Sequence, residues 1–317
     1  MPQLLESWGS DVDRFSGILE GARGGQEANV IIGSAASGVG KTHLAYAWGK
    51  HYGYSIIRRA ITSNLDAKIA PPFLWLLAQL QHLKSVPAED AVAVSDAAFL
   101  FVRLALLSFV HFSVLAVQAL LATRPDASME DKRQLLLRTH RNGNADALVT
   151  DILGGLLVQL RVVGWRVHGT DIYVLDPAMM RAYEASLSNA AFDTLGEAVL
   201  FTVDEAHELM ERPESRRVAS LFLSQRTATT RSLFYAVVLE LSSLQGDHGW
   251  SAYVTGTTLS MRRVLDSSSA SVSTRCHPRE FAPEHRFTVP DIISILRRYW
   301  AFDDVLADPI VSQHLGN

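Results

Sequence analysis

Short apolar runs without alternation occur at widely separated places in the chain. They cover residues 29–33, 54–60, 198–203, 250–255 and 286–289. Strands that are covered on both faces of a parallel sheet carry such continuous runs, whereas half-exposed strands alternate apolar and polar residues. The pattern therefore predicts an α/β fold built on a parallel sheet.

Helical periodicity dominates between the second and third of these runs. Apolar residues recur at helical spacing in 71–83, 97–122, 132–140 and 147–160. Residues 162–176 instead predict a β-hairpin that turns near His168, Gly169 and Thr170. We therefore expect a large, mainly helical insertion over residues 63–190.

The remaining segments complete the expected organisation. Residues 1–28 form a lead-in, 29–62 and 191–290 form the two parts of the core, and 291–317 form a short C-terminal helix, a partial lid. Further helices are expected at 42–51, at 217–244 with a break near 227–230, and at 292–300 after Pro290.

One apolar segment calls for a choice between protein core and membrane. Residues 97–122 are long and apolar enough to span a bilayer. They include Arg103, His111 and Gln118, however, and an arginine deep in lipid is costly. We expect a buried helix of the helical insertion, with membrane contact as the less favoured alternative.

Composition narrows the class of protein. Of the 317 residues, 48% are apolar and 20% charged, which is the balance of a globular protein with a sizeable core. A net charge of −4 argues against a dedicated nucleic-acid-binding surface. Cys276 is the single cysteine, no glycosylation sequon occurs and the first residues lack a signal-peptide pattern. We expect an intracellular protein, cytoplasmic or nuclear.

A phosphate-binding loop follows the first strand run. The motif has alanine in place of the first glycine and comprises Ala35, Ala36, Ser37, Gly38, Val39, Gly40, Lys41 and Thr42. Gly38 and Gly40 let backbone N–H groups turn towards phosphates, and the following helix adds the positive end of its dipole. Lys41 is expected to contact the β- and γ-phosphates of ATP, and Thr42 to bind Mg²⁺. The alternative is a glycine-rich surface turn.

Adjacent acidic residues end the third strand run. Asp204 is a candidate Mg²⁺ ligand, and Glu205 a candidate general base that polarises the attacking water. A helix start with capping acids is the alternative. Residues 204–207 also spell the DEAH sequence of a helicase class, but no Gln-x-x-Gly-Arg-type segment follows, so a complete helicase is not expected. His207 then has only a local hydrogen bond as its expected role.

Polar residues near the fourth strand run are further candidates. Thr255 and Thr257 are placed to sense the γ-phosphate, or are ordinary turn residues. Arg275, Arg279 and Arg286 are candidates to stabilise transition-state charge, although most such arginines are merely solvated. Cys276 and His277 have no second Cys/His pair, so a structural zinc site is not expected.

The order of these motifs resembles the additional-strand class of P-loop ATPases, which includes the AAA+ and STAND branches. More narrowly, segments 35–45, 199–209, 253–260 and 286–300 resemble the ATPase module of Crinkler and retrotransposon-hot-spot-like proteins. The resemblance covers about a third of the chain. It implies a three-layer P-loop sandwich that binds ATP. In that group the module commonly precedes an effector domain, and this chain stops soon after the last expected strand, so a full lid and an effector are not expected here.

Two functions follow from these motifs. The first is a Mg²⁺-dependent ATPase that hydrolyses ATP to ADP and phosphate in order to drive a conformational switch. The second is a nucleotide-gated signalling module with little hydrolysis. Besides the nucleotide, a second copy of the chain or another protein is an expected partner.

Overall fold

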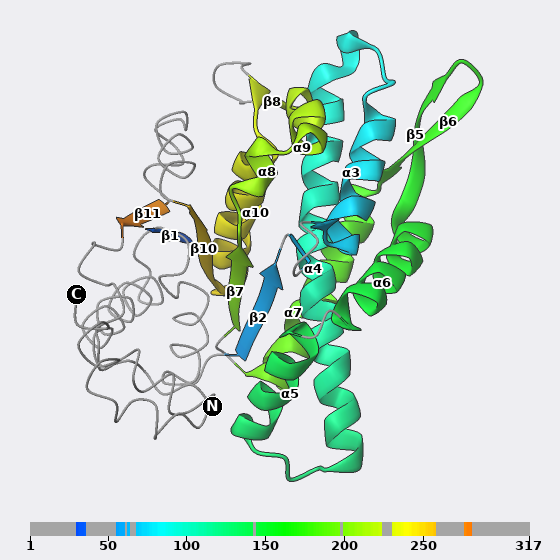
Figure 1. Ribbon diagram of the computed structural model, residues 1–317. Helices are drawn as coiled ribbons and strands as arrows, with labels where there is room; N and C mark the ends of the chain where they lie inside the picture. Colours follow the sequence, from blue (N-terminus) through cyan, green and yellow to red (C-terminus); the bar gives the residue numbers. More distant parts are fainter. Residues whose placement is uncertain are drawn as a thin grey trace, which may run out of the picture.

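A five-stranded sheet forms the centre of an α/β fold (Figure 1). The computed structural model describes residues 30–35, 55–60, 62–63, 68–141, 144–196, 199–223, 230–257 and 276–280. The strands of the sheet are β1 (Val30–Ala35), β2 (Ser55–Ala60), β7 (Val199–Asp204), β10 (Ser251–Thr257) and β11 (Cys276–Glu280). Their order is β11-β1-β10-β7-β2, and every pair is parallel. All five strands therefore end at the same edge of the sheet.

Four of the expected strands are confirmed. The runs at 29–33, 54–60, 198–203 and 250–255 correspond to β1, β2, β7 and β10, and every residue of β7 is buried. The fifth strand, β11, lies in a segment where no strand was expected. It is an edge strand of the described sheet, a place where Pro278 is tolerated because only one side of the strand is paired. The run at 286–289 and the helices at 42–51 and 292–300 lie outside the described residues.

Helices occupy most of the chain between β2 and β7. They are α3 (Pro71–Leu83), η2 (Ala88–Asp90), α4 (Ala91–Thr123), α5 (Met129–Arg141), α6 (Asn144–Leu160) and α7 (Pro177–Leu195). The mainly helical insertion is therefore present, and its expected boundary at residue 190 falls within α7. Short strands β3 (Thr62–Ser63) and β4 (Lys68–Ile69) pair before α3.

The expected hairpin is confirmed as β5 (Arg161–Val167) and β6 (Thr170–Leu175), which project from the helices in Figure 1. Its turn residues His168 and Gly169 have φ of 49° and 81°. Two successive positive φ values are the signature of the type I′ turn, whose twist suits a two-residue hairpin.

The segment after β7 differs from the expected long helix at 217–244. It contains α8 (Glu208–Glu211), α9 (Pro213–Val218), η3 (Ala219–Leu221), the paired strands β8 (Phe222–Leu223) and β9 (Thr230–Arg231), and α10 (Leu233–His248). The Oγ of Ser232 accepts a hydrogen bond from the N–H of Tyr235, and Gly249 ends α10 with φ 69°. This N-cap and this left-handed glycine give α10 its own start and end, which helical periodicity alone does not define.

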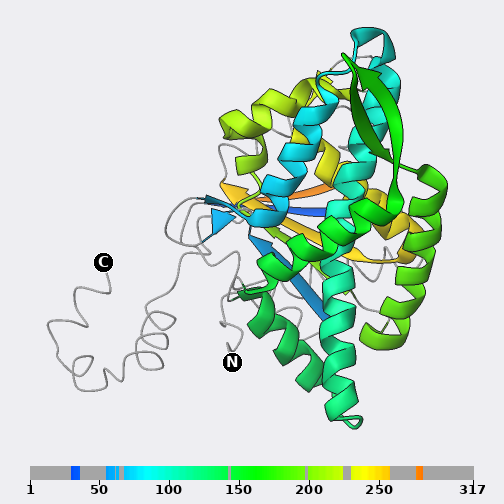
Figure 2. The ribbon, with the colours of Figure 1, turned by 90° about the vertical axis from the view of Figure 1, so that its right-hand side faces the viewer.

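Helix α4 runs through the length of the helical part and packs against α3, α5, α6, α7 and α10 (Figure 2). Its middle is buried on nearly all sides, from Phe101 to Val114. It is the one helix in the described part that is long and apolar enough to cross a membrane, and 72% of its most apolar window is buried inside the protein. That burial agrees with the expected core helix, because a helix that is apolar all round needs protein neighbours on every side.

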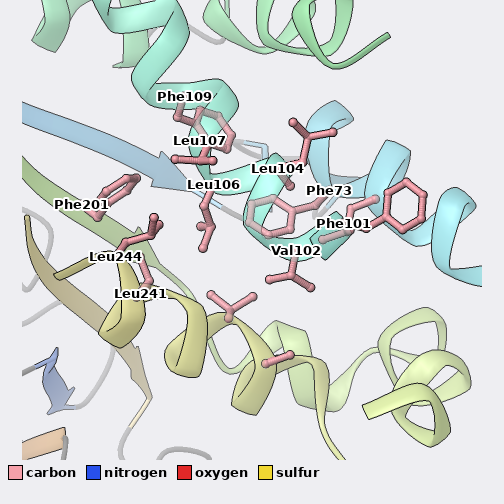
Figure 3. Close-up of a cluster of buried hydrophobic side chains, with 14 of the residues drawn as sticks. Phe73, Phe101, Val102, Leu104, Leu106, Leu107, Phe109, Phe201, Leu241 and Leu244 are labelled. Atoms are coloured by element: carbon pink, nitrogen blue, oxygen red, sulfur yellow. The ribbon is translucent and has the colours of Figure 1, made fainter. Parts of the chain in front are cut away.

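The main core lies where α4 meets the sheet and its covering helix. Figure 3 shows side chains from α3, α4, β7 and α10 in one cluster, among them Phe73, Leu106, Phe201 and Leu241. Each of these side chains is at most 4% exposed. Since full burial of one such side chain contributes roughly 1.5–3 kcal/mol, this cluster stabilises the contact among the helical insertion, α10 and the sheet.

Arg103 makes the polar connection inside this apolar contact. Its guanidinium donates to both carboxylate oxygens of Glu184 in α7, at 2.5 and 2.7 Å, and to Asp247 in α10 at 2.6 Å. It also donates to Glu240 in α10 at 3.1 Å. His248 lies 2.6 Å from the same Glu184 carboxylate. The arginine that argued against a membrane span is therefore bound by two buried acidic residues, Glu184 and Glu240, and by the exposed Asp247.

Two of these carboxyl groups have pKa values shifted in opposite directions. Burial raises the pKa of Glu240 from 4.5 to about 7, aided by repulsion from Glu184 and Asp247 and opposed by Arg103. Burial also acts against ionisation of Glu184, but hydrogen bonds from His248 and Arg103 outweigh it and lower its pKa to about 2. Glu184 is therefore the firm anionic partner of Arg103.

Replacement of Arg103 by methionine is expected to reduce the free energy of unfolding by about 3–5 kcal/mol, because it leaves buried carboxylates without their cation. Urea denaturation measures the loss. The matched control is Arg166→Met, which removes a cation paired with Asp171 on the hairpin surface and is expected to change stability little. Equal stability of the two variants would contradict this account.

Glu240→Gln is expected to change how stability depends on pH. The folded-state pKa of about 7 lies above the ordinary 4.5, so the folded protein keeps a proton that the unfolded chain releases. The contribution of Glu240 to stability is therefore full below pH 4.5 and is lost as pH rises to about 7. Unfolding free energies measured across this range should fall less steeply with rising pH in the variant than in the wild type. Parallel curves for the two proteins would refute the shift.

Candidate functional site

The candidate site lies at the edge where the parallel strands end. Across the sheet, Gly33 of β1 is paired with Thr255 of β10, and Ala35 with Thr257. On the other side of β10, Val254 is paired with Val203 of β7, so that Thr255 and Asp204 come next in register. Strands are about 4.8 Å apart, so the ends of β1 and β7 are separated by about 10 Å. Ala35, where the expected phosphate-binding motif starts, and the acidic pair therefore lie at the same edge of the sheet.

A buried hydrogen bond joins the ends of β7 and β10. The Oγ1 of Thr255 donates to Oδ1 of Asp204 at 2.6 Å, and Thr255 is fully buried while Asp204 is 4% exposed. The N–H of Glu205 donates to the same oxygen at 3.1 Å. A buried carboxylate needs such donors, and here they also fix its orientation at the strand end. The structure thus brings together Thr255 and Asp204, two residues that lie far apart in the sequence.

Glu205 has an unusual backbone conformation. Its φ is 55°, in the left-handed region that non-glycine residues rarely adopt. The adjacent groups hold it there: the preceding Asp204 carboxylate accepts its N–H, and the N–H of Ala206 donates to the carbonyl of Thr255 at 2.8 Å. The side chain of Glu205 is 40% exposed. Strained residues of this kind cluster at functional sites, where the surrounding structure maintains them.

Charged residues extend from Glu205 into the next two short helices. The Nδ1 of His207 lies 3.3 Å from Oε2 of Glu205, and its Nε2 lies 3.7 Å from Oε1 of Glu208. Glu208 in turn accepts a hydrogen bond from the Nε of Arg212 at 2.5 Å. His207 itself is 8% exposed. The contacts of the His207 side chain are therefore local, as expected, and its ring lies between two carboxylates of the same turn.

The other expected site residues are described only in part. Residues 36–42, which include Lys41 and Thr42, lie outside the described residues, and Ala35 is the last residue of β1. Thr257 ends β10, level with Ala35. Arg279 lies in β11, level with Gly33, whereas Arg275 and Arg286 lie outside the described residues. Register alone therefore places Thr257 and Arg279 at or near this edge.

A second cluster lies near the opposite edge of the sheet. In the described part of the chain, one group of His and acidic side chains has ligand atoms within 4.8 Å of one another: Glu184, Asp247 and His248. His248 precedes β10 closely and its ring packs on Trp250 at 4.7 Å. It precedes the start of β10 at Ser251, which is four residues, or about 13 Å at 3.3 Å per residue, from Thr255. Two of the three residues already bind the Arg103 guanidinium, so the cluster is an internal ion-pair network.

Sequence reasoning did not find this network. The sequence shows Arg103 only as a charge in an apolar helix, and its three acidic partners lie 81 to 144 residues away. No local spacing indicates such contacts.

Comparison with known proteins adds no relative: no family model matches the chain, and no curated protein matches it significantly. The case for a function therefore depends on the chain's own residues.

Thr255→Val is expected to lower the free energy of unfolding by about 1–3 kcal/mol, because buried Asp204 loses its shortest described donor. Thr255→Ser keeps the hydroxyl and should recover much of the loss. The control is Thr202→Val on β7, where the buried Oγ1 has no hydrogen-bond partner among the described residues. Chemical denaturation compares the three variants. A loss in Thr202→Val as large as that in Thr255→Val would argue against the Thr255–Asp204 bond.

Proposed function

We propose that this protein binds ATP together with Mg²⁺ at the edge formed by the ends of β1, β10 and β7, and hydrolyses ATP to ADP and phosphate. The observation that carries the proposal is the Thr255–Asp204 pair at this edge, beside the strand that leads into the phosphate-binding motif. The strand order supports it, since β10 lies between β1 and β7, as in the additional-strand class of P-loop ATPases. We also propose that the parallel sheet and its helices form the three-layer sandwich of a P-loop fold.

The residues present fit Mg²⁺ and a triphosphate. Mg²⁺ prefers oxygen ligands, and Asp204 offers a carboxylate whose orientation is fixed by two donors. The motif beginning at Ala35 supplies backbone N–H groups for phosphate oxygens, with Lys41 for the β- and γ-phosphates and Thr42 for the metal. When bound, Mg²⁺ neutralises charge on the phosphates.

Glu205 acts on the water that attacks the γ-phosphorus. It orients the water and takes up its proton while the bond from the γ-phosphorus to the bridging oxygen of ADP breaks. Its 40% exposed side chain reaches solvent, as a residue that receives a water must. Thr255 holds Asp204 in place, and Thr257, two residues further along β10, is the candidate contact to the γ-phosphate. Interactions of the nucleotide with this edge then change the conformation of the elements that follow β7.

Glu205→Gln is expected to lower kcat for ATP by about 100-fold or more while leaving ATP binding intact, because a general base contributes roughly 10²–10⁴-fold. Lys41→Ala is expected to weaken binding itself. Phosphate release measures turnover, and titration with a non-hydrolysable ATP analogue in the presence of Mg²⁺ measures binding.

Glu211→Gln is the control, since this acidic residue is exposed on α8, and it should match the wild type. Equal turnover in the wild type, Lys41→Ala and Glu205→Gln would refute hydrolysis at this site. Binding of the analogue without turnover in the wild type would instead favour the nucleotide-gated signalling module.

A further inference from the structure

We propose that His207 is a positioning residue that directs Glu205 towards the attacking water. This inference rests on the proposed ATPase function. His207 does not belong to the phosphate-binding motif or to the acidic pair, and neither of the roles assigned above uses it. Its placement beside Glu205 nevertheless requires an explanation, because it is a buried ring between charged groups.

The strongest observation is the state of its Nδ1 atom. Nδ1 is buried and has no partner with hydrogen-bond geometry among the described residues, although Oε2 of Glu205 is only 3.3 Å away. A buried polar atom without a hydrogen bond is costly, and at a candidate site it calls for an explanation. Catalytic hydrogen bonds are often long or misaligned before the substrate binds and tighten in the complex. A small movement of the Glu205 side chain is sufficient to form this bond.

The backbone at Glu205 supports the same conclusion. Two hydrogen bonds hold its φ at 55°: the N–H of Glu205 donates to Asp204, and the N–H of Ala206 donates to the carbonyl of Thr255. These bonds fix the main chain, whereas no such bond is described for the half-exposed side chain. A second contact is needed to select one rotamer of that side chain. His207 is the nearest donor described for it, and an imidazole with its proton on Nδ1 donates to the Glu205 carboxylate.

The other side of the ring faces a second carboxylate. Nε2 faces Oε1 of Glu208 at 3.7 Å, and Oε2 of Glu208 accepts a hydrogen bond from Arg212. Arg212 precedes α9, which packs on α3, and Lys84 donates to the carbonyl of Arg217 at 2.7 Å. His207 therefore lies between Glu205 and the short helices that contact α3.

Two conservative variants separate the two ring nitrogens. Asparagine carries an amide nitrogen near the position of Nδ1, and glutamine carries one near the position of Nε2. His207→Ala and His207→Gln are expected to lower kcat on the order of 10- to 100-fold, because displacement of a catalytic group by ~1 Å costs up to about 10²-fold. KM for ATP should stay within about twofold of the wild type. His207→Asn should keep most of the wild-type kcat.

A combined variant tests whether His207 acts through Glu205. In the Glu205→Gln background, His207→Ala should cause no further loss of kcat, since coupled residues give non-additive effects. Additional loss in that background, or equal kcat in the asparagine and alanine variants, overturns the proposal. Should the alanine variant fail to fold, the comparison of asparagine with glutamine decides the question alone, and equal activity of these two overturns it.

The outcomes also distinguish this proposal from the ATPase proposal. Wild-type turnover no higher than that of Lys41→Ala overturns both. Wild-type turnover well above Lys41→Ala, with His207→Ala as active as the wild type, leaves the ATPase proposal standing and overturns the role of His207 alone.

Discussion

Parallel pairing of the five strands is the constraint on which the candidate site depends. Because β1, β10 and β7 run in one direction with a fixed register, residues separated by more than 200 positions, from Ala35 to Thr257, reach the same edge. An antiparallel neighbour would send one of these chain ends to the opposite edge. The hydrogen bond from Thr255 to Asp204 depends on the same register, since only side chains at one level on adjacent strands meet at 2.6 Å. The relative positions of these site residues are therefore set by strand pairing in the sheet.

The helical insertion meets a different constraint. Helix α4 is apolar on nearly all sides, so it is stable only when other helices surround it, and α10 connects it to β10. One arginine inside that contact requires several anions, which are supplied by α7 and α10. This network lies near the edge where β10 begins, whereas Asp204 and Thr255 lie near the edge where it ends. The ion-pair network of the insertion and the candidate chemistry thus lie towards opposite ends of one strand.

The sequence predicted those features that depend on local pattern. Continuous apolar runs identified β1, β2, β7 and β10, helical spacing identified α3 to α6, and the hairpin turn at His168 and Gly169 followed from residue types. It did not predict β11, because Cys276–Glu280 carries a proline and charged residues and becomes a strand only by pairing with β1. A break near 227–230 was expected within one long helix, but the division into α8, α9 and the β8–β9 pair was not, since short elements of two to six residues give little periodic signal. Contacts such as Arg103 with Glu184 have no local signal at all.

Glu205, directly after β7, has two possible roles, and its backbone conformation and contacts distinguish between them. If Glu205 were only a capping acid at a helix start, it would be expected to accept hydrogen bonds from the first N–H groups of α8 with an extended backbone of its own. Its φ of 55° and its contact with His207 do not fit that description. A left-handed glutamate costs on the order of 1–3 kcal/mol, and a glycine at this position would avoid that cost. The strain is consistent with a need for the carboxylate itself at the strand end, and His207, buried beside it with an unsatisfied nitrogen, adds a second unfavourable feature at the same point. Two such features around one carboxylate are more readily explained by chemistry at Glu205 than by the stability of a four-residue helix.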